Sequence, residues 1–237
     1  MHIGMALVTG AGRGYGLELC RGLAARGAHV FGVVRGAEGA ASFAEVAGDS
    51  GTLIRADVTD EEAGDLIAAA LAARDLPLDL LVNNAGVMTS GARIADVRVA
   101  DVDRLLQVHV HGPIRCIQAA LPWLGRSPQG TIVNVTSRLG SIARIAGGTY
   151  DHLQISYAMR ISKAAQNMLT ASLHRELRTQ GIAVYAVHPG RLRTAMGSAD
   201  ADVEASEAAA RLLAWLDRNR DSKQIAYTEP ERNKLPW

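Results

Sequence analysis

Short apolar runs alternate with longer helix-like segments along almost the whole chain, and this alternation limits the possible fold more than any other feature. Several of the runs are rich in valine and isoleucine and apolar on both faces, as parallel strands buried between helix layers should be. Alternation at this spacing predicts a doubly wound parallel α/β sheet with helices on both faces. We expect strands at 5–9, 29–34, 52–56, 79–83, 130–136 and 182–188, and helices near 15–26, 60–74, 97–124, 156–180 and 206–218.

Nothing in the composition divides the chain or directs it to a charged partner. The 237 residues are 48% hydrophobic, and no repeat, low-complexity segment or linker interrupts them, so we expect a single domain over 1–237. The formal net charge of +1 predicts no general attraction to nucleic acid. No run approaches the roughly 18 apolar residues of a membrane span. Cys20 and Cys116 lie in apolar helical patterns without metal-ligand spacing, which indicates buried thiols in a cytoplasmic protein without a metal.

A glycine-rich turn follows the first predicted strand. The run 9–16 (TGAGRGYG) leaves that strand and opens the first predicted helix. Glycines there let the backbone approach a pyrophosphate, and the positive end of the helix dipole favours the anion. A glycine-rich run alone is a weak signal, but the first strand-to-helix connection is the place where dinucleotide binding requires it. The sequence therefore predicts a dinucleotide site in a Rossmann-type fold.

Further segments resemble motifs of the short-chain dehydrogenase/reductase family. The run 9–16 has the family's TGxxxGxG form, 83–86 (NNAG) matches the motif after the fourth strand, Asp57 matches the adenine-binding position, and 189–194 (PGRLRT) matches PGxxxT. The ending 234–237 (KLPW) is similar to that of the small carbonyl-reductase-like branch. The resemblance implies a nicotinamide cofactor, and a homodimer or homotetramer formed through helices 97–124 and 156–180. The cofactor-binding residues expected from these motifs and from the cation argument below are Gly10, Arg13, Gly14, Tyr15, Gly16, Arg35, Asp57, Val58, Asn83, Asn84, Ala85, Gly86, Lys163, Pro189, Gly190 and Thr194.

The residues after the second strand favour NADP(H) over NAD(H). A site selective for NAD has a carboxylate there for the ribose 2′-hydroxyl, whereas an NADP site has a cation for the 2′-phosphate. This chain has Arg35 at that place, with Arg13 in the glycine turn. A guanidinium can bind phosphate oxygens in a fork. The alternative for Arg35 is a solvated loop arginine.

Of the four positions in the family's catalytic set, two are retained and two are replaced. Ser137 matches the serine that polarises the substrate oxygen, and Lys163 matches the lysine that holds the nicotinamide ribose. The family's proton-donating tyrosine lies four residues before that lysine, on the same helix face, where this chain has Met159. A thioether donates no proton. Tyr157 is rotated by about 120° from that face if both residues are helical, so it can substitute only if the helix starts late or bends.

Other residues are candidates for the missing acid. His109 stands where the family has an asparagine near the lysine, and an imidazole can donate a proton near neutral pH. The alternative for His109 is a satisfied core histidine. The connection from Ser137 to Lys163 is longer than the family usually needs, and it carries Tyr150 and His152. We assign His109 to the catalytic set with Ser137 and Lys163.

These residues predict an atypical NADP(H)-dependent oxidoreductase that acts on a carbonyl or alcohol group of a partly apolar small molecule, of the kind met in specialised metabolism. Two alternatives stay open, because a fold alone does not choose among them. One is a non-redox enzyme on the same scaffold, such as a cyclase, isomerase or dehydratase, and the other is a catalytically inactive NADP(H)-binding protein. We expect substrate contacts from Met159, Tyr157, Tyr150, His152 and Arg138, with Leu139, Ile142 and the segment 191–199 as further pocket candidates.

Overall fold

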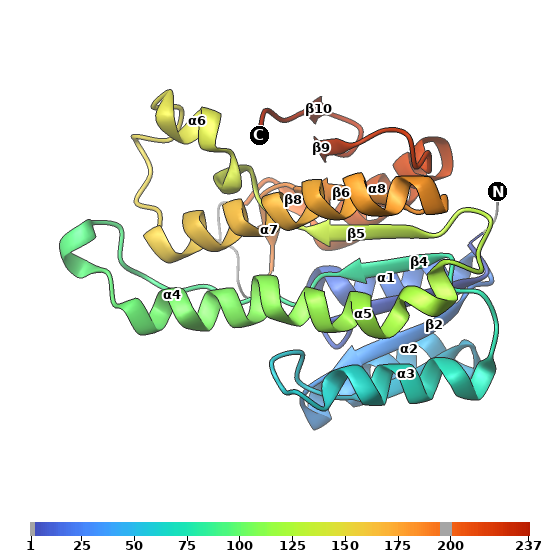
Figure 1. Ribbon diagram of the computed structural model, residues 1–237. Helices are drawn as coiled ribbons and strands as arrows, with labels where there is room; N and C mark the ends of the chain where they lie inside the picture. Colours follow the sequence, from blue (N-terminus) through green and yellow to red (C-terminus); the bar gives the residue numbers. More distant parts are fainter. Residues whose placement is uncertain (1–2, 195–200) are drawn as a thin grey trace.

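One eight-stranded sheet runs through the computed structural model, which describes residues 3–194 and 201–237 (Figure 1). Its order is β10-β9-β6-β5-β4-β1-β2-β3, and within the described residues every neighbouring pair is parallel except β9 and β10. The chain winds outward from β1 in both directions, which confirms the predicted doubly wound sheet. The strands are β1 Met5–Thr9, β2 His29–Val34, β3 Gly51–Arg55, β4 Leu80–Asn83, β5 Thr131–Val135, β6 Ala183–Val187, β9 Ala226–Glu229 and β10 Asn233–Lys234, and the short β7 Leu192–Arg193 and β8 Val203–Glu204 pair apart from the sheet.

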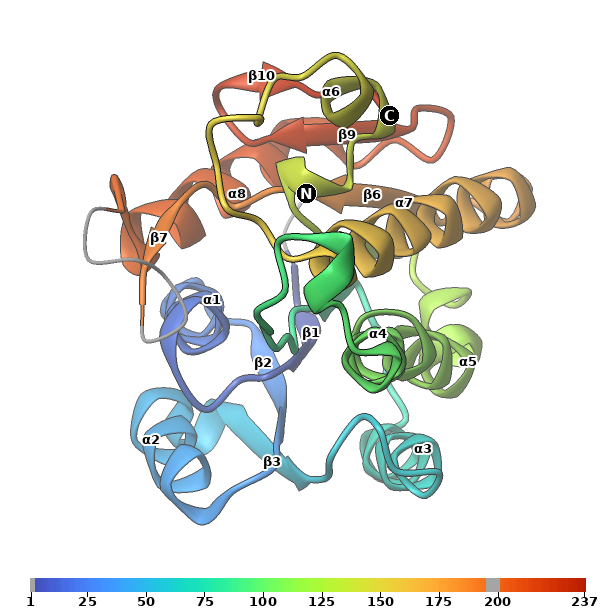
Figure 2. The ribbon, with the colours of Figure 1, turned by 90° about the vertical axis from the view of Figure 1, so that its left-hand side faces the viewer.

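Helices cover both faces of the sheet. Figure 2 shows α1, α2 and α8 on one face, and α3, α4, α5 and α7 on the other. Each layer has its own buried apolar cluster: Leu19 and Leu213 belong to the first, and Ile67 and Ile117 to the second. The helices are α1 Gly14–Ala25, α2 Ala37–Ala47, α3 Ala63–Arg74, α4 Val99–Leu106, α5 Gly112–Leu124, α6 Ile142–Ala146, α7 Tyr157–Leu177 and α8 Ala205–Asn219.

The helix expected over 97–124 is divided. Between α4 and α5 the residues Gln107–His111 form a π-helical turn, in which the Gly112 N–H donates to the Gln107 carbonyl five residues back. Pro113 follows, and proline has no N–H to donate to the carbonyl of residue 109. The normal hydrogen-bond ladder is therefore interrupted at His109. Turns of this kind are frequent at functional sites.

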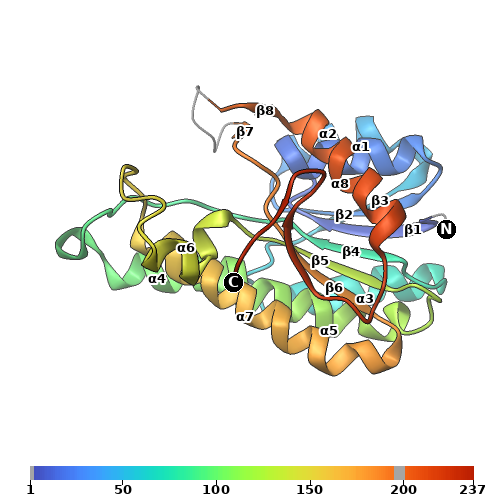
Figure 3. The same ribbon diagram turned by 90° about the horizontal axis from the view of Figure 1, so that it is seen from above.

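The chain end lies against the long connection after β5. β9 extends the sheet beside β6, and Leu235 N–H donates to the Tyr227 carbonyl at 2.7 Å. The Ser141 hydroxyl then donates to the Pro236 carbonyl at 2.6 Å, and Ala143 N–H donates to the Trp237 carbonyl at 3.1 Å. Figure 3 shows the C-terminus beside α6 as a result. These bonds hold the segment that follows Ser137.

The cysteines and the helices of this fold bear on two expectations from the sequence. Cys20 and Cys116 are both buried and unpaired, as the sequence predicts. Within the described ranges, no helix has the length and hydropathy of a membrane span. Over the same residues, His, Cys, Asp and Glu side chains form no group of three that could hold a metal ion.

Candidate active site

The glycine turn after β1 is packed too closely for side chains. A Cβ at Gly16 would lie 2.2 Å from the Gly10 carbonyl oxygen. Asn84 holds that oxygen and its neighbour, because its Nδ2 donates to the carbonyls of Thr9 at 2.9 Å and Gly10 at 3.3 Å. Gly14 has a φ of +53°, which disfavours side chains, and a Cβ there would lie 3.4 Å from Thr194 Cγ2. The motifs at 9–16, 83–86 and 189–194 therefore form one cradle.

Cations flank the end of β2 beside this cradle. Arg35 pairs with Asp57, with Nη1 3.2 Å from Oδ2, while 73% of its side chain stays exposed. Burial raises the pKa of Asp57, but hydrogen bonds from Thr59 and the charge of Arg35 lower it more, so the net direction is down. The side chain of Arg13 makes no ion pair with any residue that the structure describes. No acidic residue directly follows β2, and the exposed Arg35 guanidinium uses only Nη1 toward Asp57, so its other N–H groups remain for an anion.

Several predicted cofactor residues direct their side chains into the protein. The Tyr15 ring is 5% exposed, and among the described atoms its hydroxyl finds no hydrogen-bond partner. The Asn83 amide donates to Asn134 Oδ1 at 2.9 Å, and Val58 is buried in the core. These three residues can therefore offer a dinucleotide only main-chain groups. Ala85, Gly86, Pro189 and Gly190 lie in the connections that leave the carboxyl ends of β4 and β6.

Lys163 is buried on α7, against the end of β5. It is 5% exposed, and its Nζ donates to the Val135 carbonyl and to Gln166 Oε1, each at 2.9 Å. An ammonium has three N–H groups, and the third has no partner among the described residues. Burial lowers the pKa of Lys163 to about 7. The group can therefore gain or lose a proton near neutral pH.

Gln166 also belongs to this site, although no sequence motif marks it. Its side chain is 1% exposed and is bound to Lys163, three residues before it on the helix. Its main-chain carbonyl accepts from the Thr170 hydroxyl at 2.9 Å, and that hydroxyl accepts from Asn134 Nδ2 at 3.0 Å. A polar chain through the core thus fixes the turn that carries Gln166. The signal was an amide at i+3 from a lysine, on the same helix face.

Ser137 follows β5, two residues after Val135, whose carbonyl accepts from Lys163. Its Oγ accepts a hydrogen bond from Leu139 N–H at 3.3 Å. Because the oxygen is the acceptor there, the hydroxyl hydrogen remains for a substrate oxygen. The Tyr227 hydroxyl donates to the Ser137 carbonyl at 2.5 Å, so β9 fixes the backbone of this residue.

Met159, which the sequence predicts at the position of the family's tyrosine, lies in a helix without distortion. α7 begins at Tyr157, with Ser156 as its N-cap, and continues through Lys163. Met159 and Lys163 therefore share a face, and Tyr157 lies off it. The Arg160 guanidinium lies over the Tyr157 ring, 5.6 Å from its centroid. The late start or bend that Tyr157 would need as a substitute acid is not present in α7.

His109 links three elements through both ring nitrogens. Its Nε2 accepts from Val87 N–H at 3.3 Å, which leaves the proton on Nδ1, 3.0 Å from the Ser162 hydroxyl. That hydroxyl donates onward to the Met159 carbonyl at 3.2 Å. Burial first, and then the charge of Lys163, lower the pKa of His109 to about 2. The expected role of His109 as a proton donor does not fit a fully buried, neutral imidazole whose two nitrogens are engaged.

A pocket of about 310 Å³ opens beside Met159, between the connection after β4 and the start of α7. None of its ten lining residues is ionisable, and hydroxyls and one amide supply the polar part. Its size is within the range of small-molecule sites. The connection 88–92 was missed by the sequence analysis because it lacks a motif. The lining residues are Met88, Thr89, Ser90, Gly91, Ala92, Leu139, Gln154, Ile155, Ser156 and Met159.

Of the residues expected to contact substrate, Met159 and Leu139 line this pocket. Tyr157, Tyr150, His152 and Arg138 do not. Tyr150 is buried beneath Arg138, whereas His152 is exposed to solvent. Ile142 is 65% exposed on α6, and residues 195–199 of the last candidate segment lie outside the described residues.

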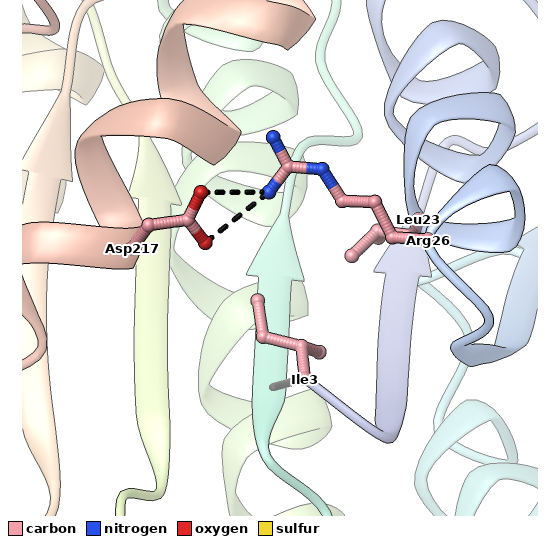
Figure 4. Close-up of a pocket in the computed structure, with 4 residues that line it drawn as sticks. All are labelled: Ile3, Leu23, Arg26 and Asp217. Carbon is pink, nitrogen blue, oxygen red and sulfur yellow. Dashed lines mark hydrogen bonds and ion pairs between the residues drawn. The ribbon is translucent and has the colours of Figure 1, made fainter. Parts of the chain in front are cut away.

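A second hollow lies at the opposite end of the strands, where the chain enters β1. Figure 4 shows its lining residues, Ile3, Leu23, Arg26 and Asp217, with Arg26 bonded to both oxygens of Asp217. It holds only about 40 Å³. In parallel sheets, ligands bind at the carboxyl ends of the strands, and this hollow lies beside the segment that enters β1. We therefore place the candidate active site at the carboxyl ends of the strands, beside Ser137 and Lys163.

Comparison with known proteins agrees with this geometry. Residues 4–205 match the family model described as short chain dehydrogenase. A cis-4-hydroxycyclohexanecarboxylate dehydrogenase of Sinomonas cyclohexanicum is 34% identical over 227 residues, covering 94% of this chain and 88% of that protein. The C-signal of Myxococcus xanthus is 34% identical over 161 residues, covering 68% of this chain and 93% of that protein. The NADPH-bound carbonyl reductase from chicken fatty liver superposes with a TM-score of 0.87 at 28% identity, over 100% of both chains. The chain therefore belongs to the short-chain dehydrogenase family.

Proposed function

We propose that this chain is an NADP(H)-dependent oxidoreductase that acts on a carbonyl or alcohol group of a partly apolar small molecule. The observation that carries the proposal is the buried Lys163, whose Nζ is held against the end of β5, two residues before Ser137. A pocket opens next to Met159, one helical turn before this lysine. Two relatives support it, since one is named a dehydrogenase and another a carbonyl reductase with NADPH. The name of the first relative refers to a compound with a hydroxyl and a carboxylate on one ring, so ring alcohols and ketones are the first compounds to assay.

The residues of the cradle fit a dinucleotide. Side chains at Gly16 and Gly12 would collide with backbone at 2.2 and 2.6 Å, so the turn is kept bare where a pyrophosphate approaches a helix N-terminus. Arg35 and Arg13 would hold the 2′-phosphate, and the third N–H of Lys163 would donate to a ribose hydroxyl. NADPH, when bound, supplies a hydride to a carbonyl carbon.

Lys163 then takes the part of the missing tyrosine in our proposal. The Ser137 hydroxyl donates to the carbonyl oxygen and polarises it, and the alkoxide that results needs one proton. Met159 has none to give, and the pocket lining holds no ionisable residue. With a pKa of about 7, the Lys163 ammonium can release to the alkoxide the proton of that third N–H, the one that would otherwise donate to the ribose hydroxyl, and recover it from solvent. His109 acts as a positioning residue that fixes Val87 and the start of α7.

The experiment follows NADPH absorbance and product formation together, with cyclic ketones as substrates. Stoichiometric oxidation of NADPH supports the redox function, whereas product formed with the cofactor unchanged would establish the non-redox alternative. Lys163→Arg tests the proton source, because arginine keeps the charge but does not deprotonate. In the parent protein, reduction should slow as the pH rises through about 7, and in Lys163→Arg this dependence should disappear. A dependence that is the same in both proteins would remove Lys163 from the proton-donor role.

We also propose a homodimer or homotetramer formed through α4, α5 and α7. Two of these helices, α4 and α7, expose apolar side chains, with Val99 72%, Ile161 45% and Met168 66% exposed. Burying such side chains would stabilise an interface by about 25 cal/mol per Å² of apolar surface. Sedimentation velocity tests the assembly, and a monomer at micromolar concentration would contradict it.

A further inference from the structure

Two arginines converge on one buried tyrosine in the connection that follows Ser137. The Tyr150 side chain is 5% exposed. Arg144 on α6 donates from Nη1 to the Tyr150 hydroxyl at 2.9 Å, and the Arg138 guanidinium lies over the same ring, 5.3 Å from its centroid. Tyr150 therefore orients both guanidinium groups before any ligand arrives. Such pre-organisation lowers the entropy that binding must otherwise overcome.

The positive charge of this pair has no ion-pair partner among the residues that the structure describes. Neither Arg138 nor Arg144 makes an ion pair with a carboxylate of the described residues, whereas the nearby Arg232 pairs with Glu229 at 3.3 Å. His188 adds no charge, because burial and then Arg138, Arg144 and Arg232 lower its pKa to about 3. A guanidinium has five N–H donors, and Arg144 uses one of them here. Both arginines are half-buried, so they remain accessible from solvent.

The pair complements the uncharged pocket. Leu139 lines the pocket, and Arg138 lies between it and Ser137 on the same short 3-10 turn, Arg138–Gly140. The pocket itself offers apolar surface, hydroxyls and one amide, which suit the neutral body of a molecule. Arg138 does not line the pocket, but it directly precedes Leu139 on this turn, and this connection is what places the arginine pair next to the pocket in our inference.

We infer that Arg138 and Arg144 form a binding site for a carboxylate on the substrate, so that the substrate class is a keto acid or hydroxy acid with a compact apolar body. This inference rests on the proposed oxidoreductase function. A guanidinium fork binds a carboxylate through two parallel hydrogen bonds, which gives specificity as well as affinity. A purely structural role, in which the arginines only stack and stabilise the loop, makes a different prediction. It would affect charged and uncharged ligands equally.

The test measures binding of 4-oxocyclohexanecarboxylate and of its methyl ester to the full-length protein saturated with NADP⁺, by titration calorimetry. The ketone and NADP⁺ are both oxidised, so no hydride transfer occurs and binding is read without turnover. The variants are Arg138→Gln and Arg144→Gln, and Arg144→Lys keeps the charge without the fork. Arg175→Gln, exposed near the end of α7, is the matched control. Thermal melting of each variant checks that it is folded.

The parent protein should bind the acid about tenfold or more tightly than the ester, because the hydrogen bonds are charge-assisted. Each Gln variant should lose that preference while its ester affinity stays within about twofold, since only the charged contact is removed. Equal affinities for acid and ester in the parent, including no binding of either, overturn the inference. An equal loss for both ligands in the Gln variants overturns it in favour of the structural role. A separate assay of NADPH oxidation with the ester tests the proposed function, and its failure leaves the binding result to stand alone.

Discussion

Replacing Lys163 by methionine should change how the stability of the protein depends on pH. The two side chains have similar length, but methionine does not titrate. Burial lowers the pKa of Lys163 from its ordinary 10.5 to about 7 in the folded protein. In the unfolded chain the lysine is solvated and keeps its proton up to a pH of about 10.4. Between these two values the unfolded state binds one more proton than the folded state.

The sign follows from proton linkage. Where the unfolded state binds more protons, the free energy of unfolding rises with pH, by about 1.4 kcal/mol per pH unit for one proton. At pH 7 the folded lysine is still half protonated, so from pH 7 to pH 9 the parent should gain about 2 kcal/mol relative to Lys163→Met. Below pH 7, burying the charged lysine lowers the free energy of unfolding by on the order of 5 kcal/mol. This cost disappears gradually as the pH rises from about 7 to about 10.4, the pKa in the unfolded chain. The parent should thus be least stable, relative to the variant, below pH 7.

The slope is more informative than the stability at any single pH. Methionine leaves the Val135 carbonyl and Gln166 without their donor, which costs about 1–3 kcal/mol for each buried group left unsatisfied. This loss offsets the relief of burying no charge, but it does not vary with pH. The difference in slope therefore isolates the titration of Lys163 itself.

The assay is urea denaturation of the cofactor-free protein at pH 7, 8 and 9, followed by tryptophan fluorescence and circular dichroism. Lys223→Met is the matched control, because Lys223 is exposed and the substitution is the same. The control should keep the pH dependence of the parent, and Lys163→Met should not. Parallel curves for the parent and Lys163→Met would refute the account of a buried lysine that titrates near neutral pH.

Three other substitutions test the site. Arg35→Ala should weaken NADPH binding by about tenfold or more and leave NADH binding unchanged, because only NADPH carries the 2′-phosphate; titration calorimetry checks it, and an equal effect on both cofactors would count against the assignment. Met159→Tyr should raise NADPH-dependent reduction of small ketones by supplying a hydroxyl beside Lys163; Met159→Phe, which adds the ring alone, should not, and equal rates in the two variants would contradict the reasoning. His109→Ala should lower the free energy of unfolding by about 2–5 kcal/mol, because a fully buried, twice-bonded ring is lost. Because His109 is neutral in the folded state, the pH–rate profile between pH 5 and 8 should keep its shape in that variant, and a lost inflection would restore the imidazole as the acid.

The parts of the fold with a strong local signal were predictable. Each sheet strand from β1 to β6 lies within a residue or so of its expected range, because buried parallel strands read as continuous apolar runs. α2 was missed, since its residues 37–47 (AEGAASFAEVA) are mostly small and include a glycine, which blurs the helical period. β9 and β10 were missed because they are short: β9 is held by pairing with β6, far away in the sequence, and β10 pairs only with β9.

The sequence by itself determined the fold class and the cofactor class, and it predicted the glycine cradle and a methionine in place of the tyrosine, because glycines in a βα turn and a residue four before a lysine are local facts. The chemistry of the site was decided by tertiary structure. His109 reads as an acid in the sequence, yet burial beside Lys163 lowers its pKa and keeps the ring neutral, while Val87 and Ser162 engage both nitrogens from other elements. Lys163 reads as an ordinary ammonium, yet burial against β5 brings its pKa near 7. Desolvation and long-range hydrogen bonds set proton affinities, and neither exists until distant segments of the chain pack together.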